Sequence, residues 1–304
     1  MKIGLIGAGA VGAYFIWGFG RSEDKTREFV VIAEGERKER YIKNGFKVNK
    51  LEFHPKVETC DEAGECDVII MATKSYCLRE AVSMLPKLVG ENTVVLSMLN
   101  GVDSEEIIAD VVGWDHVIHS VILIPSRRYT EEVIFDENYP IAVYYGALDI
   151  TNREEKLELV KQAVAGTKLN FVESHDILYD EWYKYARNIC NNLPQTVVMA
   201  PSGIYTRSEH GKFIAEKLWQ EVRQLAKFKG VTLGEHADMY ACVDSTRYST
   251  LQDIDNKRRT EVECLCGYLI DFAKKNGVEV PYIEYTYHAI KLLEEKNEGK
   301  FDVE

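Results

Sequence analysis

The first half of the chain carries short apolar runs in which polar residues do not alternate with apolar ones. After an opening strand at residues 2–6, these Val- and Ile-rich runs cover residues 29–33, 68–72, 94–98 and 117–124. Strands that are covered on both faces of a sheet have this character, and such strands usually lie parallel. Residues 78–88 have apolar side chains at helical spacings and predict a helix between two of the strands. This alternation predicts an α/β fold with a doubly wound parallel sheet.

The pattern changes near residue 150, after which helices predominate. Thr151 is expected to cap a helix over residues 152–165, and residues 168–172 are expected to add one more strand. We place a domain boundary near Glu173. The sequence therefore predicts an α/β domain over residues 1–173 and an all-helical domain over residues 174–304.

One long helix is expected within the helical half. Ser249 and Gln252 have the spacing of a capping box, which marks a helix start. Apolar residues then recur at helical spacings from Val262 to Ala273, and two lysines and Gly277 follow. Basic residues and a glycine are typical of a helix end, so we expect a helix from Ser249 to Gly277.

Composition and charge narrow the class of protein. The chain has 304 residues, 46% of them hydrophobic, which suits two domains with real cores. Its 37 Lys and Arg against 49 Asp and Glu give a net charge of −12, which argues against partners such as nucleic acid or an anionic membrane. Seven cysteines without a Cys-x-x-Cys motif indicate neither a zinc site nor a disulfide framework. We expect reduced thiols, no metal and a cytoplasmic location.

The segment after the first strand carries a glycine motif. It reads Gly7, Ala8, Gly9, Ala10, Val11 and Gly12, it opens a helix, and Glu34 stands at the end of the next strand. This is the context of a Rossmann dinucleotide site, where the glycines allow a tight turn, approach of the pyrophosphate and close packing. The alternatives are a glycine-rich turn that binds no nucleotide, or a site for FAD. The six glycines of residues 3–20 also argue against a signal peptide or a membrane span.

Three polar residues follow one another at four-residue steps in the second half. Lys184, Asn188 and Asn192 drift only about 80° around a helix, so they share one face. One ammonium and two amides on a largely apolar helix can hold a carbonyl, a hydroxyl or a carboxylate. By itself this pattern would more simply be a solvated helix face.

Several separated segments occur together with the glycine motif. They are residues 72–76 (Ala-Thr-Lys-Ser-Tyr), 99–102 (Leu-Asn-Gly-Val), 181–192 (Glu-Trp-Tyr-Lys-Tyr-Ala-Arg-Asn-Ile-Cys-Asn-Asn), 251–254 (Leu-Gln-Asp-Ile) and 259–261 (Arg-Thr-Glu). In this order they make the chain resemble the ketopantoate reductase (2-dehydropantoate 2-reductase) family, from Met1 to about Pro281. The resemblance implies an oxidoreductase that reduces 2-dehydropantoate to (R)-pantoate with NADPH or NADH, in pantothenate and coenzyme A biosynthesis. It also implies that the reaction lies in a cleft between the two domains.

The resemblance further implies roles for single residues. In the family, a lysine and two asparagines at four-residue steps begin the C-terminal domain, as Lys184, Asn188 and Asn192 do here. Lys184 is then the general acid, since a lysine in water is protonated at neutral pH. The two asparagines position the substrate.

Four more residues match the family's motifs. Glu261 is expected to orient the lysine or bind a substrate hydroxyl, and Ser249 to take the carboxylate. Asn100 would hold the substrate and the nicotinamide end, and Lys74 would lie near the cofactor. Lys74 and Asn100 both follow predicted strands, at the sheet edge where open α/β sheets bind ligands. Without the resemblance, Glu261 would be taken for a surface charge. Cys190, beside the polar face, is interpreted as a packed thiol with no role in the chemistry.

Glu34 departs from the family pattern and bears on the cofactor. Ketopantoate reductases commonly carry an arginine there, facing the 2′-phosphate of NADPH. A carboxylate 22 residues after Gly12 instead suits the ribose 2′-hydroxyl of NADH and would repel a phosphate. Arg37, Lys38 or Lys74 could offset that repulsion. Glu34 therefore favours NADH.

Two other functions remain open at this point. The first keeps the chemistry and changes the substrate to another branched 2-oxo acid. The second is a non-catalytic protein that senses dinucleotides on the same fold, which would need the glycine motif but neither Lys184 nor Glu261. The expected partner is a small-molecule 2-oxo acid, and self-association as a homodimer is left open.

Overall fold

The computed structural model describes residues 1–24, 26–124, 126–129, 132–237 and 243–302. The chain forms two compact units. The first comprises Met1–Leu99 and Ser104–Ile177, and the second comprises Asn100–Asp103 and Leu178–Glu304. The short segment at Asn100 thus belongs with the helical half of the chain. The division into domains at residues 1–173 and 174–304 stays a prediction.

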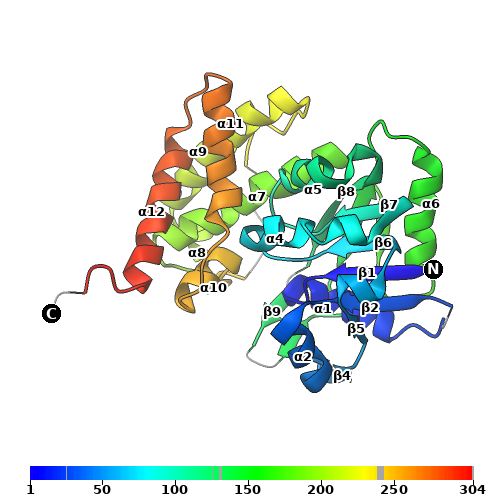
Figure 1. Cartoon of the computed structure of the whole chain (residues 1–304). Helices are drawn as coiled ribbons and strands as arrows, with labels where there is room; N and C mark the ends of the chain where they lie inside the picture. The colour runs from blue at the N-terminus through cyan, green and yellow to red at the C-terminus, as the bar shows by residue number, and fades with distance from the viewer. Residues whose placement is uncertain (25, 125, 130–131, 238–242, 303–304) are drawn as a thin grey trace. The chain divides into compact units, whose positions relative to one another are not determined.

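An eight-stranded sheet forms the centre of the first unit (Figure 1). Its strands are, in spatial order, β12 (Phe171–Glu173), β11 (Ala142–Gly146), β8 (Val117–Leu123), β7 (Val89–Ser97), β6 (Cys66–Met71), β1 (Lys2–Ile6), β2 (Glu28–Ile32) and β5 (Lys56–Glu58). All neighbours from β8 to β5 pair in parallel, and only β11 pairs antiparallel, with β8. The sheet confirms the predicted α/β class, with β5 and β11 as strands that the sequence analysis missed.

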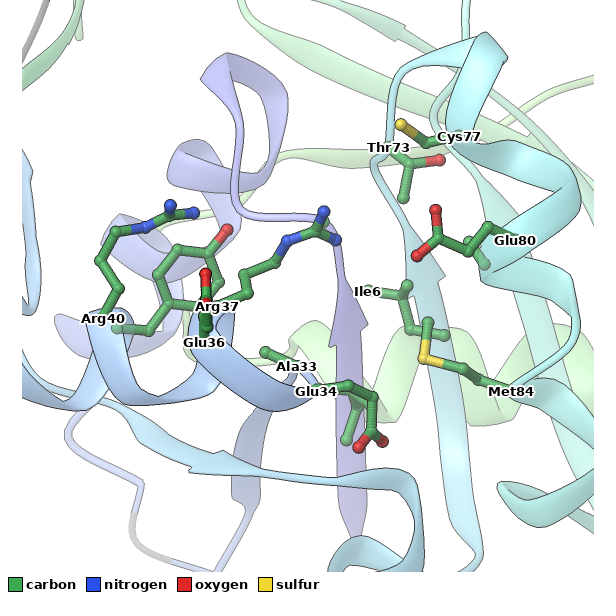
Figure 2. A pocket seen from close by; sticks show the side chains of 14 residues that line it. Ile6, Ala33, Glu34, Glu36, Arg37, Arg40, Thr73, Cys77, Glu80 and Met84 are labelled. Carbon is green, nitrogen blue, oxygen red and sulfur yellow. The ribbon is translucent and has the colours of Figure 1, made fainter.

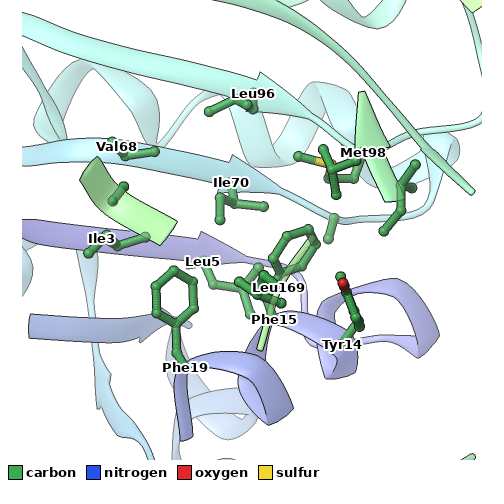
Figure 3. Packing of buried hydrophobic residues seen from close by; sticks show 14 of the residues in the cluster. Ile3, Leu5, Tyr14, Phe15, Phe19, Val68, Ile70, Leu96, Met98 and Leu169 are labelled. Atoms are coloured by element: carbon green, nitrogen blue, oxygen red, sulfur yellow. The ribbon is translucent and has the colours of Figure 1, made fainter. Parts of the chain in front are cut away.

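Helices cover both faces of this sheet. Leu5 and Ile70 lie in the core cluster that contains Phe15 of helix α1 (Ala10–Gly20), as Figure 3 shows. The neighbouring residues Ile6 and Ile69 point to the opposite face, where α4 (Leu78–Val82) and α5 (Ser104–Val112) pack. Successive strand residues point to opposite faces, so both must be apolar when both faces are covered. This explains the uninterrupted apolar runs.

The remaining helices of the first unit connect the strands. They are α2 (Gly35–Asn44), α3 (Cys60–Ala63) and α6 (Arg153–Val164), with 3-10 turns at Ser75–Cys77, Leu85–Lys87 and Trp114–His116. A second, four-stranded sheet has the order β4 (Leu51–Phe53), β3 (Phe46–Val48), β10 (Glu132–Phe135) and β9 (Ser126–Arg128). The β3–β4 hairpin turns at Asn49 and Lys50, whose φ angles are 48° and 65°. The sequence analysis missed this sheet, although its apolar residues alternate with charged ones.

Two predictions for the first unit are wrong in detail. The helix expected over residues 78–88 ends at Val82, because Pro86 disfavours the helical conformation in the residue before it and lacks an N–H. Thr151 does not cap α6. Its N–H and hydroxyl instead donate to Asp115, and Asn152 takes the N-cap position with a left-handed φ of 54°.

The second unit is helical, as predicted. Its helices are α7 (Ile177–Val197), α8 (Gly203–Arg207), α9 (Glu209–Ala226), α10 (Ser249–Asp255), α11 (Tyr268–Lys275) and α12 (Pro281–Asn297), with a 3-10 turn at Lys227–Lys229 and a π-helix at Glu263–Gly267. Their apolar faces enclose a separate core around the fully buried Trp219 and Tyr185. Among the described residues, no helix combines the length and apolar character needed to cross a membrane.

The single long helix expected from Ser249 to Gly277 is also wrong. Helix α10 ends at Asp255, and Lys257 follows with a φ of 52° that no helix continues. The capping box is absent, because Tyr248 holds the N-cap position and the Gln252 amide donates to the Arg247 carbonyl. The predicted end is close to that of α11, which stops two residues before Gly277.

Candidate functional site

The glycine motif forms a turn between β1 and α1. Gly7 has a φ of 98°, and a Cβ there would lie 2.6 Å from the carbonyl carbon of Ala72. At Gly12 a Cβ would lie 2.1 Å from the Gly7 oxygen. Gly9 differs, because its φ of −83° suits any residue and a Cβ would meet nothing within 4 Å. The space beside Gly9 is therefore open, which allows a ligand to come close to the protein backbone there. The turn fits a dinucleotide.

This difference between two glycines makes a testable prediction. Gly9→Ala should leave the melting temperature nearly unchanged, because the protein has room for the methyl group. It should weaken dinucleotide binding by about tenfold or more, because the methyl group occupies the ligand's space. Gly12→Ala should instead destabilise the fold by about 1–3 kcal/mol, since the clash is with backbone. Thermal melting and a fluorescence titration with NADH measure both effects; equal affinity for Gly9→Ala and wild type would contradict the assignment.

A pocket of about 450 Å³ opens beside this turn (Figure 2). Its wall includes Gly7, the β2 end at Glu34, and Arg37 and Arg40 on α2. It lies where β1, β2 and β6 end, and its volume is in the range of small-molecule sites. Thr73 faces it with a buried hydroxyl that has no hydrogen-bond partner among the described residues. These features fit the nucleoside part of a dinucleotide.

The predicted cofactor residues are only partly brought together here. Gly7 and Glu34 line the pocket, whereas Lys74 is outside its lining, exposed at the N-cap of the turn Ser75–Cys77. Lys38 pairs with Glu62, and this hydrogen bond lowers the pKa of Glu62 to about 2. Of the three cations considered for a 2′-phosphate, only Arg37 lines the pocket.

The Glu34 carboxylate is itself held in place. Its Oε1 accepts hydrogen bonds from the backbone N–H and the thiol of Cys60, each at 2.8 Å. Burial, and then the bond to Glu34, raise the pKa of the Cys60 thiol. The thiol therefore stays protonated at neutral pH and acts as a donor.

In the second unit, three predicted site residues form one hydrogen-bonded chain. The Lys184 ammonium donates to Asn100 Oδ1 at 3.1 Å, and the Asn100 amide donates to Glu261 Oε2 at 3.2 Å. All three belong to the same unit, although Asn100 and Lys184 are 84 positions apart. Glu261 is 6% exposed, so it is not the surface charge that its basic neighbours suggested. A buried carboxylate needs such partners, and Asn100 supplies one.

Two further predicted residues meet between α7 and α10. Asn192 donates to the Ser249 hydroxyl at 3.5 Å, a long contact. Asn192 is 5% exposed, and its side-chain oxygen Oδ1 has no hydrogen-bond partner among the described residues. Asn188 lies one turn from both Lys184 and Asn192 on α7 and is buried. A ligand with a hydroxyl donor would satisfy the open Asn192 acceptor.

The π-helix after Glu261 is fixed by a residue that sequence reasoning missed. The Tyr185 hydroxyl lies 2.7 Å from the Cys264 carbonyl and 2.8 Å from the Leu265 carbonyl. Single π-turns often occur at functional sites. Tyr185 follows Lys184 directly, which was the available signal. Cys190 is fully buried, and burial raises its pKa well above the ordinary value, as expected for a packed thiol.

The first unit carries a dinucleotide-binding turn on a parallel sheet, and the helical unit carries a lysine that is hydrogen-bonded through an amide to a carboxylate. Together these features define a nicotinamide-dependent oxidoreductase. Family models for ketopantoate reductase PanE/ApbA match residues 3–149, and for its C-terminal part residues 176–294. The chain belongs to the ketopantoate reductase PanE/ApbA family and is an NAD(P)H-dependent oxidoreductase.

Individual relatives are distant but span the whole chain. An uncharacterized oxidoreductase, YkpB of Bacillus subtilis, is 25% identical over 97% of this chain and 99% of its own length. A 2-dehydropantoate 2-reductase of Nostoc sp. is 26% identical, with 97% and 96% covered. Among solved structures, D-mandelate dehydrogenase with NADH and anilino(oxo)acetate has a TM-score of 0.86 at 21% identity, with 98% and 99% covered. A 2-dehydropantoate 2-reductase of Geobacter metallireducens has a TM-score of 0.78 at 21% identity, with 96% and 99% covered.

Proposed function

We propose that the protein reduces 2-dehydropantoate to (R)-pantoate, as a step of pantothenate and coenzyme A biosynthesis. The observation that carries the proposal is the hydrogen-bonded chain from Lys184 through Asn100 to Glu261. A bound reduced nicotinamide supplies the hydride that converts a 2-oxo acid into a 2-hydroxy acid. The residues of this chain must then bind the acid and deliver a proton to the developing alkoxide.

Lys184 is the proton donor of this proposal. Its ammonium delivers a proton to the developing alkoxide oxygen and stabilises the negative charge while it forms. Asn100 orients the ammonium through Oδ1, and Glu261 fixes the Asn100 amide so that its oxygen faces the lysine. Asn100 and Glu261 thus hold the lysine in a fixed orientation. Much of the catalytic advantage of a preorganised site comes from such positioning.

The substrate is held by the neighbouring polar residues. The Ser249 hydroxyl donates to the substrate carboxylate. Asn188 adds a side-chain amide on the face of α7 that carries Lys184 and Asn192. The open side-chain oxygen Oδ1 of Asn192 accepts a hydrogen bond from the substrate's 4-hydroxyl. This last contact favours a hydroxylated 2-oxo acid, because an unfilled buried acceptor costs free energy.

NADH is the proposed cofactor. Glu34 stands on the pocket wall with Oε2 bonded to none of the described residues, so it can accept from a ribose 2′-hydroxyl. Arg37 on the same wall opposes this preference, since a guanidinium attracts a 2′-phosphate. Lys74 stays a proposed cofactor residue at the edge of the sheet.

A substrate comparison tests the proposal. 3,3-Dimethyl-2-oxobutanoate differs from 2-dehydropantoate only by lacking the 4-hydroxyl. We expect kcat/KM for 2-dehydropantoate to exceed that for the analogue by about tenfold or more, because the analogue leaves the Asn192 acceptor unpaired. Asn192→Ala should bring the two values together. A preference for the analogue would contradict the assigned substrate.

Reduction of another branched 2-oxo acid is the second candidate. It is favoured by the similarity to D-mandelate dehydrogenase, whose solved structure contains NADH and an oxoacetate compound. A panel of branched and aromatic 2-oxo acids in the same assay separates the two candidates by their kcat/KM values.

Two features of the cellular setting complete the proposal. None of the six described cysteines forms a disulfide, which favours a reducing compartment such as the cytoplasm. Self-association as a homodimer is proposed with support from a ketopantoate reductase of Staphylococcus aureus that is described as dimeric.

A further inference from the structure

Glu34 is held at the pocket wall by a residue from a neighbouring strand connection. Cys60 begins α3 directly after β5, which pairs with β2, the strand that Glu34 follows. Thr59 fixes this turn, since its side chain accepts from the Glu62 N–H in a capping box. The Cys60 N–H and thiol are therefore presented to Glu34 by a rigid element.

These bonds determine where the carboxylate lies. Both Cys60 donors reach Oε1, and Oε2 has no hydrogen-bond partner among the described residues. Arg37 is three residues further on α2, at a spacing that normally allows a carboxylate and a guanidinium to pair. Figure 2 shows the two side chains pointing apart, and no ion pair joins them among the described residues.

We propose that Cys60 is a positioning residue for cofactor selection, because its thiol keeps the Glu34 carboxylate facing the ribose position and away from Arg37. The proposal rests on the proposed NADH-dependent function and adds a residue outside the pocket lining. Without the thiol, one of the two donors is lost. The carboxylate can then turn to Arg37, so it both binds a ribose hydroxyl less well and repels a 2′-phosphate less.

The thiol suits this task chemically. Cys60 is 7% exposed, so its donor competes little with water. It is a neutral donor to a carboxylate, which makes the pair a charge-assisted hydrogen bond without a second charge in the pocket. Serine keeps a donor of similar reach, whereas alanine removes it and leaves only the backbone N–H.

The test measures dissociation constants for NADH and NADPH on each purified protein by fluorescence titration. We expect Cys60→Ala to lower the ratio of the NADPH constant to the NADH constant by about three- to tenfold, the effect of one ordinary hydrogen bond. Cys60→Ser should keep the ratio within about twofold. Both constants come from the same sample, so the ratio does not depend on the folded fraction. Cys60→Val replaces the alanine variant if that protein does not fold.

Two controls separate positioning from general destabilisation. Cys66 is another buried thiol of the same unit, at the start of β6. Its Sγ lies 3.7 Å from the Gly64 carbonyl, and Cys66→Ala should leave the ratio unchanged. In a Glu34→Gln background, Cys60→Ala should have no further effect on the ratio. An unchanged ratio in Cys60→Ala, with wild type still binding dinucleotide, overturns this inference alone. Wild type that binds neither dinucleotide overturns the proposed function and the inference together.

Discussion

Lys184→Ala should lower kcat for 2-oxo acid reduction by about 10²- to 10⁴-fold, the contribution that general acid catalysis typically makes. The reason is the position of the ammonium at the end of a hydrogen-bonded chain through Asn100 to the buried Glu261. The substitution removes both the proton that is delivered and the positive charge that stabilises the developing alkoxide. The affinity for NADH should change little, because the dinucleotide turn lies in the other unit.

The matched control is Lys212→Ala, the same substitution at an exposed lysine on α9 of the same unit. It should leave kcat near the wild-type value. Lys184→Met keeps most of the side-chain volume and should be as inactive as the alanine variant. Equal inactivity of the two variants would show that the loss of kcat comes from the missing ammonium group. Turnover by Lys184→Ala at a rate close to wild type would remove the lysine from the reaction.

Glu34→Arg should reverse the cofactor preference. A carboxylate and a 2′-phosphate about 4 Å apart repel by roughly 1 kcal/mol in water and about 4 kcal/mol at an effective dielectric near 20. Since Glu34 is exposed, the value lies between these limits. The ratio of kcat/KM for NADPH over NADH should therefore rise by about fivefold to a thousandfold.

Glu39→Arg provides the comparison for that variant. It makes the same charge change on α2 at an exposed position outside the pocket, so only the long-range effect of the charge remains. That effect should be small and should fade with added salt. A wild-type protein that already prefers NADPH tenfold would show that Arg37 outweighs Glu34.

The sheet and its cofactor turn were predictable because local chemistry decides them. Apolar runs such as residues 68–72 become strands covered on both faces, and the glycines at positions 7 and 12 have no room for a side chain. The spacing of Lys184, Asn188 and Asn192 likewise specifies one face of α7 wherever that helix packs.

Several of the failures depend on side-chain contacts that local periodicity does not encode. Thr151 is drawn to Asp115, a residue far away in sequence, and so does not cap its own helix. The break at Lys257 follows a bond between the Arg258 side chain and Asp253 that periodicity cannot reveal. The hydrogen bond from Cys60 to Glu34 was equally unpredictable from local sequence, because it depends on the pairing of β5 with β2.

The central claim is that this protein transfers a hydride from a nicotinamide cofactor to the carbonyl carbon of a 2-oxo acid. NADH that carries deuterium at C4, prepared separately on each face of the ring, tests it with 2-dehydropantoate and mass spectrometry of the product. We expect pantoate one mass unit heavier with one labelled cofactor and unlabelled pantoate with the other, because a folded site presents only one face. Saturating cofactor binding without any labelled 2-hydroxy acid, from 2-dehydropantoate or from a panel of other 2-oxo acids, would contradict the account.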